Sequence, residues 1–127
     1  MTPTEIDELE LKHFSPETDP KINWETVSPA AIKLLDNART LAGTPFQITS
    51  NYRTPDHSVA VGGICNDAHT ENPCTAFDIA YSTHQQRAAI LIACIKAGFE
   101  RWGWNDKNNH VHVDCSPHLP SPACWIE

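Results

Sequence analysis

The chain has 127 residues and a formal net charge of −7 at pH 7, from 9 Lys and Arg against 16 Asp and Glu. This length fits one small domain, and a hydrophobic content of 40% is enough to build a core. The acidic balance argues against a protein that binds nucleic acids by neutralising phosphates, and against a polybasic membrane anchor. The longest strongly apolar run, residues 88–95, is far shorter than the roughly 20 residues of a membrane-spanning helix.

The two ends of the chain are expected to be irregular parts of a single domain, residues 1–127. Proline is concentrated in residues 3–29 and 117–122, which predicts an irregular leader over 1–27 and an irregular tail over 116–127. The first residues, MTPTEIDELELK, lack the basic-then-apolar pattern of a secretory signal, so no signal peptide is expected.

A first helix is predicted between Ser28 and Gly43. Ser28 suits the N-cap, Pro29 the first helical position and Gly43 the C-terminal end. Apolar residues recur at helical spacing between them and give the helix one apolar face.

A second helix is predicted to follow Ser82. Ser82 is interpreted as its N-cap, with Gln85 completing a capping box, and Gly98 as its end. Apolar residues nearly encircle this helix, so we expect it to be heavily buried.

The remaining regular segments predict strands, over 45–50, 75–81, 99–104 and 110–115. In the segment 75–81, Phe77 and Ile79 share one face and Asp78 lies on the other. The sequence therefore predicts an α+β fold, in which a small, mostly antiparallel sheet packs against two main helices.

Four residues suggest a metal site on the open face of that sheet: His69, Asp78, His110 and His112. Alternate residues of a strand point the same way, so His110 and His112 would enter one cleft side by side. Asp78 stands among apolar neighbours, an odd setting for a carboxylate without a partner. Catalytic zinc sites take three ligands of this mixed kind. Each residue alone has a plainer explanation, such as a solvent-facing His-x-His pair.

The order of these residues resembles a known family, the zinc D-alanyl-D-alanine carboxypeptidases. That family belongs with the lysostaphin-type peptidases and the hedgehog signalling domain in one superfamily of peptidoglycan metallopeptidases and relatives. The resemblance lies in the segments ITSNYRTP (48–55), VGGI (61–64), AH (68–69), AFDI (76–79) and HVHVD (110–114).

The resemblance implies a role for each matching residue. His69, Asp78 and His112 would bind Zn²⁺, His110 would transfer protons, and Arg53 would hold substrate or the developing oxyanion. A fixed guanidinium suits either carboxylate or oxyanion.

The match departs from the family pattern near the last ligand. Asn109 stands where relatives often carry an acidic general base, so catalysis would depend on His110. Asp106 and Asp114 are the alternative bases.

The function implied is zinc-dependent hydrolysis of an amide bond in the stem peptides of bacterial peptidoglycan, by a carboxypeptidase of D-Ala-D-Ala type. The alternatives are an L-alanyl-D-glutamate endopeptidase, as in phage endolysins, or a zinc-containing domain that only binds. We expect a monomer that acts at the cell wall or in the periplasm, exported or released by phage lysis. No nucleic acid or membrane partner is expected. Trp102 or Trp104 could border the substrate groove, although core packing is the plainer interpretation.

The spacing of the cysteines suggests two local disulfides. Cys65 and Cys74 lie nine positions apart, as do Cys115 and Cys124, while Cys94 falls inside the second helix as a buried thiol. The alternative is that all five thiols are reduced.

Overall fold

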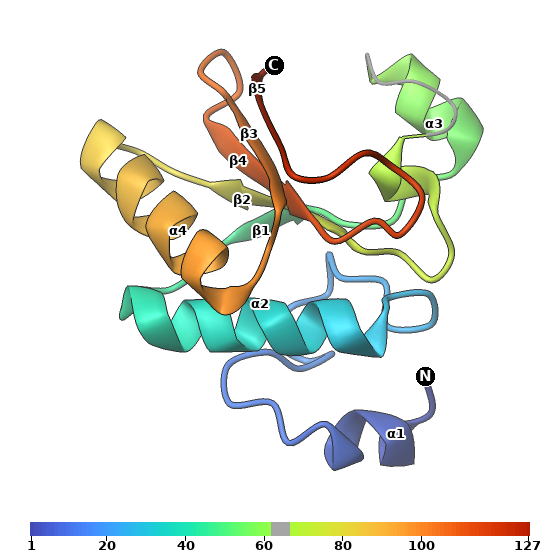
Figure 1. Ribbon diagram of the computed structural model, residues 1–127. Coiled ribbons are helices and arrows are strands. Elements are labelled where there is room, and N and C mark those ends of the chain that lie inside the picture. The colour runs from blue at the N-terminus through green and yellow to red at the C-terminus, as the bar shows by residue number, and fades with distance from the viewer. Residues whose placement is uncertain (62–66) are drawn as a thin grey trace.

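The computed structural model describes residues 1–61 and 67–127. Its elements in chain order are α1 (Pro3–Glu8), α2 (Pro29–Ala42), β1 (Ile48–Ser50), α3 (Pro55–Ala60), a 3₁₀ turn (Ala68–Thr70), β2 (Ala76–Ala80), α4 (His84–Ala97), β3 (Arg101–Asn105), β4 (His110–Asp114) and β5 (Ala123–Ile126) (Figure 1). The double glycine of the VGGI segment and Cys65 lie outside the described residues.

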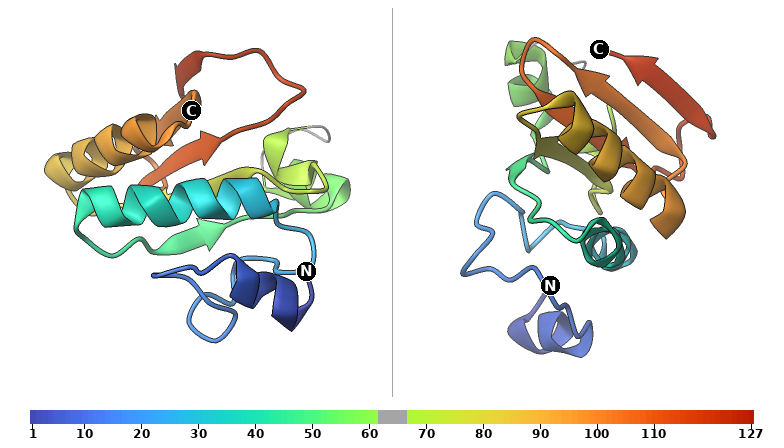
Figure 2. Two further views of the ribbon diagram at one scale, coloured as in Figure 1. Left: turned by 60° about the horizontal axis from the view of Figure 1, so that its bottom comes forward. Right: turned by 90° about the vertical axis from the view of Figure 1, so that its left-hand side faces the viewer.

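The strands form one sheet in the order β1-β2-β4-β3-β5. The pairs β1–β2, β2–β4 and β3–β4 are antiparallel, and β5 lies parallel to β3 at the outer edge (Figure 2). This confirms the α+β class and the mostly antiparallel sheet. The register places Asp78, His112, Gly103 and Trp125 opposite one another in a single row across four strands.

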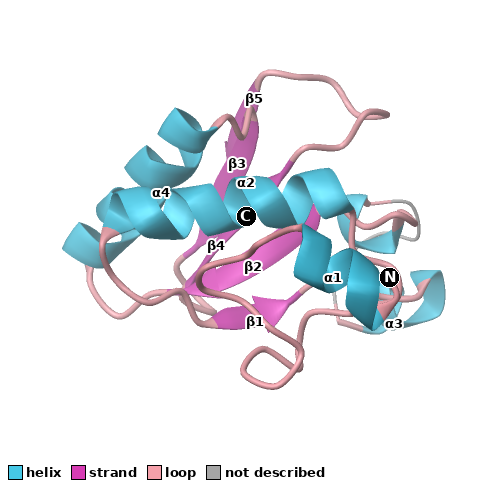
Figure 3. Ribbon diagram, turned by 90° about the horizontal axis from the view of Figure 1, so that it is seen from below, coloured by secondary structure: helices cyan, strands magenta, loops and turns pink. Residues whose placement is uncertain are grey.

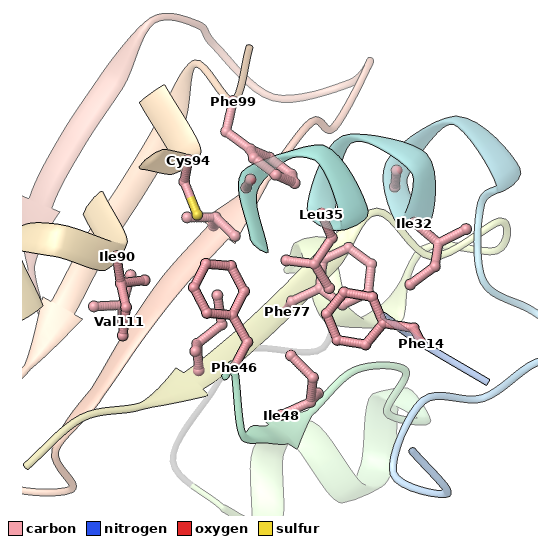
Figure 4. Close-up of a cluster of buried hydrophobic side chains, with 14 of the residues drawn as sticks. Phe14, Ile32, Leu35, Phe46, Ile48, Phe77, Ile90, Cys94, Phe99 and Val111 are labelled. Atoms are coloured by element: carbon pink, nitrogen blue, oxygen red, sulfur yellow. The ribbon is translucent and has the colours of Figure 1, made fainter. Parts of the chain in front are cut away.

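Helices α2 and α4 pack against each other and cover one face of the sheet (Figure 3). Their apolar side chains meet those of β2 and β4 in one core, drawn in Figure 4. Among its members are Leu35 from α2, Ile90 from α4, Phe77 from β2 and Val111 from β4, each fully buried. The sheet face opposite these helices is therefore free to carry polar side chains.

The predicted start and end of α2 are confirmed. The Ser28 hydroxyl accepts a hydrogen bond from the Ala31 N–H, and Gly43 ends the helix at φ 69°, a left-handed conformation that glycine adopts readily.

The predicted N-cap of α4 is wrong by one residue. Thr83 caps the helix through a bond from the Gln86 N–H, while the Ser82 N–H donates to the Gln86 side chain. The expectation of heavy burial is also wrong, since Ile92 and Ile95 are 53% and 43% exposed. Helix α4 lies against α2 and the sheet on one side only, so its outward apolar residues face solvent.

Both end segments, predicted to be irregular from their proline content, contain a regular element. Helix α1 lies on the side of α2 away from the sheet (Figure 1), and β5 extends the sheet. The chain between α1 and α2 is held by the buried carboxylate of Asp36 in α2, which accepts hydrogen bonds from the backbone N–H groups of Lys12 and His13. None of the helices in the described part is long and apolar enough to cross a membrane.

The predicted disulfide between Cys115 and Cys124 is wrong, because both are free thiols. Strand β3 separates β4, which leads into Cys115, from β5, which carries Cys124. Two strand spacings amount to about 9–10 Å, beyond the roughly 7 Å between Cα atoms that a disulfide tolerates. Cys74 is also a buried free thiol, and its predicted partner Cys65 lies outside the described residues. Cys94 is buried and free as predicted, and burial raises the pKa of its thiol to about 12.

Candidate active site

The three predicted metal ligands come together from three separate elements. His69 lies in the 3₁₀ turn, Asp78 in β2 and His112 in β4, and all three are at most 5% exposed. His69 Nε2 lies 3.1 Å from Asp78 Oδ1 and 3.2 Å from His112 Nδ1. His112 Nδ1 lies 3.3 Å from Asp78 Oδ1, which closes a triangle of possible ligand atoms.

The spacing and chemistry of this triangle fit zinc. Ligand atoms at about 2.0–2.1 Å from a tetrahedral zinc ion stand about 3.3–3.4 Å from one another. Two imidazoles and one carboxylate are also a set found in catalytic zinc sites.

Hydrogen bonds behind the triangle fix which nitrogen of each imidazole faces inward. His69 Nδ1 lies 2.6 Å from the carbonyl oxygen of Asn51, and His112 Nε2 lies 2.6 Å from Asp114 Oδ2. Metal-binding histidines commonly donate their outer N–H to such acceptors. The outer contacts therefore orient Nε2 of His69 and Nδ1 of His112 toward Asp78.

The electrostatics of this cluster favour positive charge between the carboxylates. Burial alone would raise the pKa of Asp78, but hydrogen bonds with His112 and His69 hold it far below its usual range. Burial would lower the pKa of His112, but its bonds to Asp114 and Asp78 raise it to about 9. A cation among these groups would meet the same charge requirement as the imidazole proton.

Asp114 connects the cluster to β3. It is fully buried, and its Oδ1 accepts hydrogen bonds from Arg101 Nε at 2.9 Å and from the Ser116 N–H at 3.0 Å. Burial would raise the pKa of Asp114, and the bond with His112 together with the Arg101 charge lowers it. The carboxylate is thus held ionised behind His112.

The cluster lies in a cleft of about 690 Å³ whose floor is the open face of β2 and β4. One wall comes from the segment around α3, and the other from β5 and the loop before it. The first segment follows the edge strand β1, and β5 is the strand at the opposite edge of the sheet. The wall residues are Arg53, Val61, Asp67 and Ala68 on the first side, and Leu119, Trp125 and Glu127 on the second.

Arg53 lies in the first wall, as a residue that meets substrate would. Its Nη2 atom is 3.6 Å from Asp67 Oδ2, a carboxylate oxygen that also accepts a 2.6 Å hydrogen bond from the Ser58 hydroxyl. Arg53 Nε is buried and has no hydrogen-bond partner within the described residues. The Arg53 side chain itself lines the cleft.

His110 stands beside the cluster on the same face of β4. Its Nε2 atom lies 3.9 Å from Asp78 Oδ2 and 3.0 Å from Glu127 Oε2. The other bases considered are occupied elsewhere: Asp106 binds Arg87 at 2.7 Å, and Asp114 binds His112. Of the proton-transfer candidates named from the sequence, His110 is therefore the one next to the cluster, and Glu127 is its titratable neighbour in the cleft.

Two cleft residues, Trp125 and Glu127, were missed by the sequence reasoning. The Trp125 ring centroid lies 5.3 Å from that of His112, and the Arg101 guanidinium carbon lies 5.1 Å from the Trp125 ring centroid. A Cβ on Gly103 would approach Trp125 to 2.7–2.8 Å, so this ring lies directly over a glycine. The signal was the alternation in ACWIE, which places Trp125 and Glu127 on one face of a strand. Trp102 and Trp104 instead pack against the core, as the plainer interpretation held.

Comparisons with known proteins agree with this geometry. The family model Peptidase M15 matches residues 6–114. The L-Ala D-Glu endopeptidase ChiX of Serratia marcescens has a similar fold, with a TM-score of 0.61 and 15% sequence identity over 87% of this chain and 95% of that one. No curated protein matches the chain. The family match covers most of the chain, both main helices and four of the five strands, and it establishes that the protein belongs to the Peptidase M15 family of zinc-dependent metallopeptidases.

Proposed function

We propose that the protein hydrolyses an amide bond in the stem peptides of bacterial peptidoglycan, with D-alanyl-D-alanine as the substrate end group. The observation that carries the proposal is the buried triangle of His69, Asp78 and His112 at the floor of an open cleft. Such a substrate would place the activity at the cell wall.

The residues of the cleft have separate roles in the proposed hydrolysis. His69, Asp78 and His112 would hold a zinc ion, which would supply the Lewis acidity that polarises a carbonyl and lets water ionise near neutral pH. His110 moves protons between water and the departing amine, since its imidazole lies at the edge of the cluster. Arg53, which lines the cleft, binds the carboxylate of the terminal D-alanine through its guanidinium.

An L-alanyl-D-glutamate endopeptidase is the second candidate. The fold likeness to ChiX favours it, because that protein carries this activity by its name. A domain that only binds zinc is less well supported, because His110 stands beside the ligand cluster in a cleft open to a substrate.

A digest of purified muropeptides, followed by mass spectrometry, tests the proposal. We expect loss of one terminal D-alanine by the zinc-loaded protein, no product with a chelator, and recovery when zinc is added back. Cleavage between L-alanine and D-glutamate would instead assign the second candidate. A protein that takes up no stoichiometric zinc on titration, or that is saturated with zinc and leaves every muropeptide intact, would overturn the proposal.

A further inference from the structure

We propose that Glu127 is a positioning residue for His110, so that β5 is a functional part of the active site. The inference rests on the proposed function in one respect, the assignment of proton transfer to His110. It goes beyond that function by assigning a role to a segment that lies outside the residues matched by the family model.

The backbone of β5 places Glu127 over the cleft. Residues Ala123–Ile126 pair in parallel with β3, and the Glu127 N–H continues the ladder with a 2.8 Å bond to the carbonyl of Trp104. Successive residues of a strand point to opposite faces, so Glu127 shares the cleft face with Trp125 while Ile126 points away, 69% exposed. The sheet, rather than a free tail, therefore holds the carboxylate.

The side chain of Glu127 makes the shorter of two contacts at His110 Nε2. Its Oε2 atom lies at hydrogen-bond distance, 3.0 Å, whereas Asp78 Oδ2 is at 3.9 Å. A carboxylate that accepts the Nε2–H bond fixes both the tautomer and the ring orientation of a histidine. Asp78 binds the other two imidazoles through Oδ1, and its Oδ2 lies too far from His110 for a hydrogen bond, so among the described residues Glu127 is the carboxylate that holds His110.

The kinetic test compares Glu127→Gln with Ile126→Ala, its neighbour on the outer face of the same strand. In Glu127→Gln we expect kcat to fall about 10- to 100-fold, with KM and the zinc stoichiometry unchanged. Ile126→Ala should keep the wild-type kcat, because its side chain faces solvent. Equal kcat for Glu127→Gln and wild type, or equal losses in both variants, would overturn the proposal.

Nuclear magnetic resonance of the histidine rings supplies a readout that needs no substrate. The His110 resonances are assigned with a His110→Ala variant and followed with and without zinc. We expect a hydrogen-bonded Nε2–H tautomer in the wild type and its loss in Glu127→Gln. An unchanged spectrum would overturn the pairing. If wild-type protein cleaves no muropeptide, the proposed function fails, and this spectrum still decides whether Glu127 positions His110.

Discussion

The two faces of strands β2 and β4 carry side chains of opposite character. Toward the helices, Phe77 and Val111 are fully buried in the apolar core. One residue along, Asp78 and His112 lie on the opposite face and form the floor of the cleft. The comparison shows how a small domain builds a site: because successive residues of a strand alternate between faces, the same strands that close the core also present ligands at fixed spacing.

The largest expected effect comes from removing a ligand on the cleft face. Asp78→Ala deletes the carboxylate between two buried imidazoles, so we expect no stoichiometric zinc in metal analysis and no detectable hydrolysis. Asp56→Ala, which removes an exposed carboxylate in α3, is the matched control and should keep both properties. Full zinc content in Asp78→Ala would contradict the assigned ligand set.

The next largest effect is expected for a substitution on the same face that impairs catalysis but leaves zinc bound. His110→Ala removes the proton-transferring imidazole, and we expect the hydrolysis rate to fall about 10²- to 10⁴-fold. Zinc content should stay at the wild-type level, because His110 is not among the three ligand atoms that converge. Persistent hydrolysis, measured as initial rate on muropeptides, would show that another group moves the proton.

A substitution on the helix-covered face of the sheet should lower the stability of the fold. Phe77 is fully buried and meets Phe99 edge to face with ring centroids 6.5 Å apart. Phe77→Ala should lower the free energy of unfolding by about 3–5 kcal/mol, as large-to-small core changes do. Urea unfolding of the zinc-free protein measures this loss, and Ile92→Ala on the exposed face of α4 should change little. Equal losses in the two variants would contradict the core assignment.

The smallest loss of stability is expected for a substitution at the contact between Gly103 of β3 and Trp125 of β5. Gly103→Ala places a methyl group within 2.7–2.8 Å of Trp125, so the ring or β5 must shift. We expect a loss of about 1–3 kcal/mol in unfolding free energy, with a change in tryptophan fluorescence. The double variant Gly103→Ala with Trp125→Ala should lose less than the sum of the two single variants. Additive losses would show that the contact with the Trp125 backbone oxygen, which Trp125→Ala retains, causes the loss instead of the ring.

The sequence was sufficient to predict the elements whose signals are local. The capping of α2 by Ser28 and the alternation around Asp78 and His112 each depend on a few neighbouring residues, and the fold confirms those elements. The sequence pattern alone did not predict that His69 lies next to Asp78 and His112, because residue spacing does not determine where a loop packs against a sheet. That step came from the resemblance to a family.

The features that were missed depend on contacts between distant segments. Strand β5 is stabilised by pairing with β3, and its four alternating residues, which directly follow Pro122, are a weak strand signal by themselves. Without that strand, Glu127 had no reason to be placed near His110. The predicted disulfide between Cys115 and Cys124 failed for the same reason, because β3 was not known to lie between them.

The separation of the cleft floor from its two walls has a consequence for engineering. The floor is fixed by core packing on its other side, whereas Val61 and Leu119 reach the cleft from segments outside the strands. Side chains in such segments tolerate replacement better than those over a core. A library that randomises these two positions is therefore expected to change which peptide is accepted while the metal ligands keep their geometry.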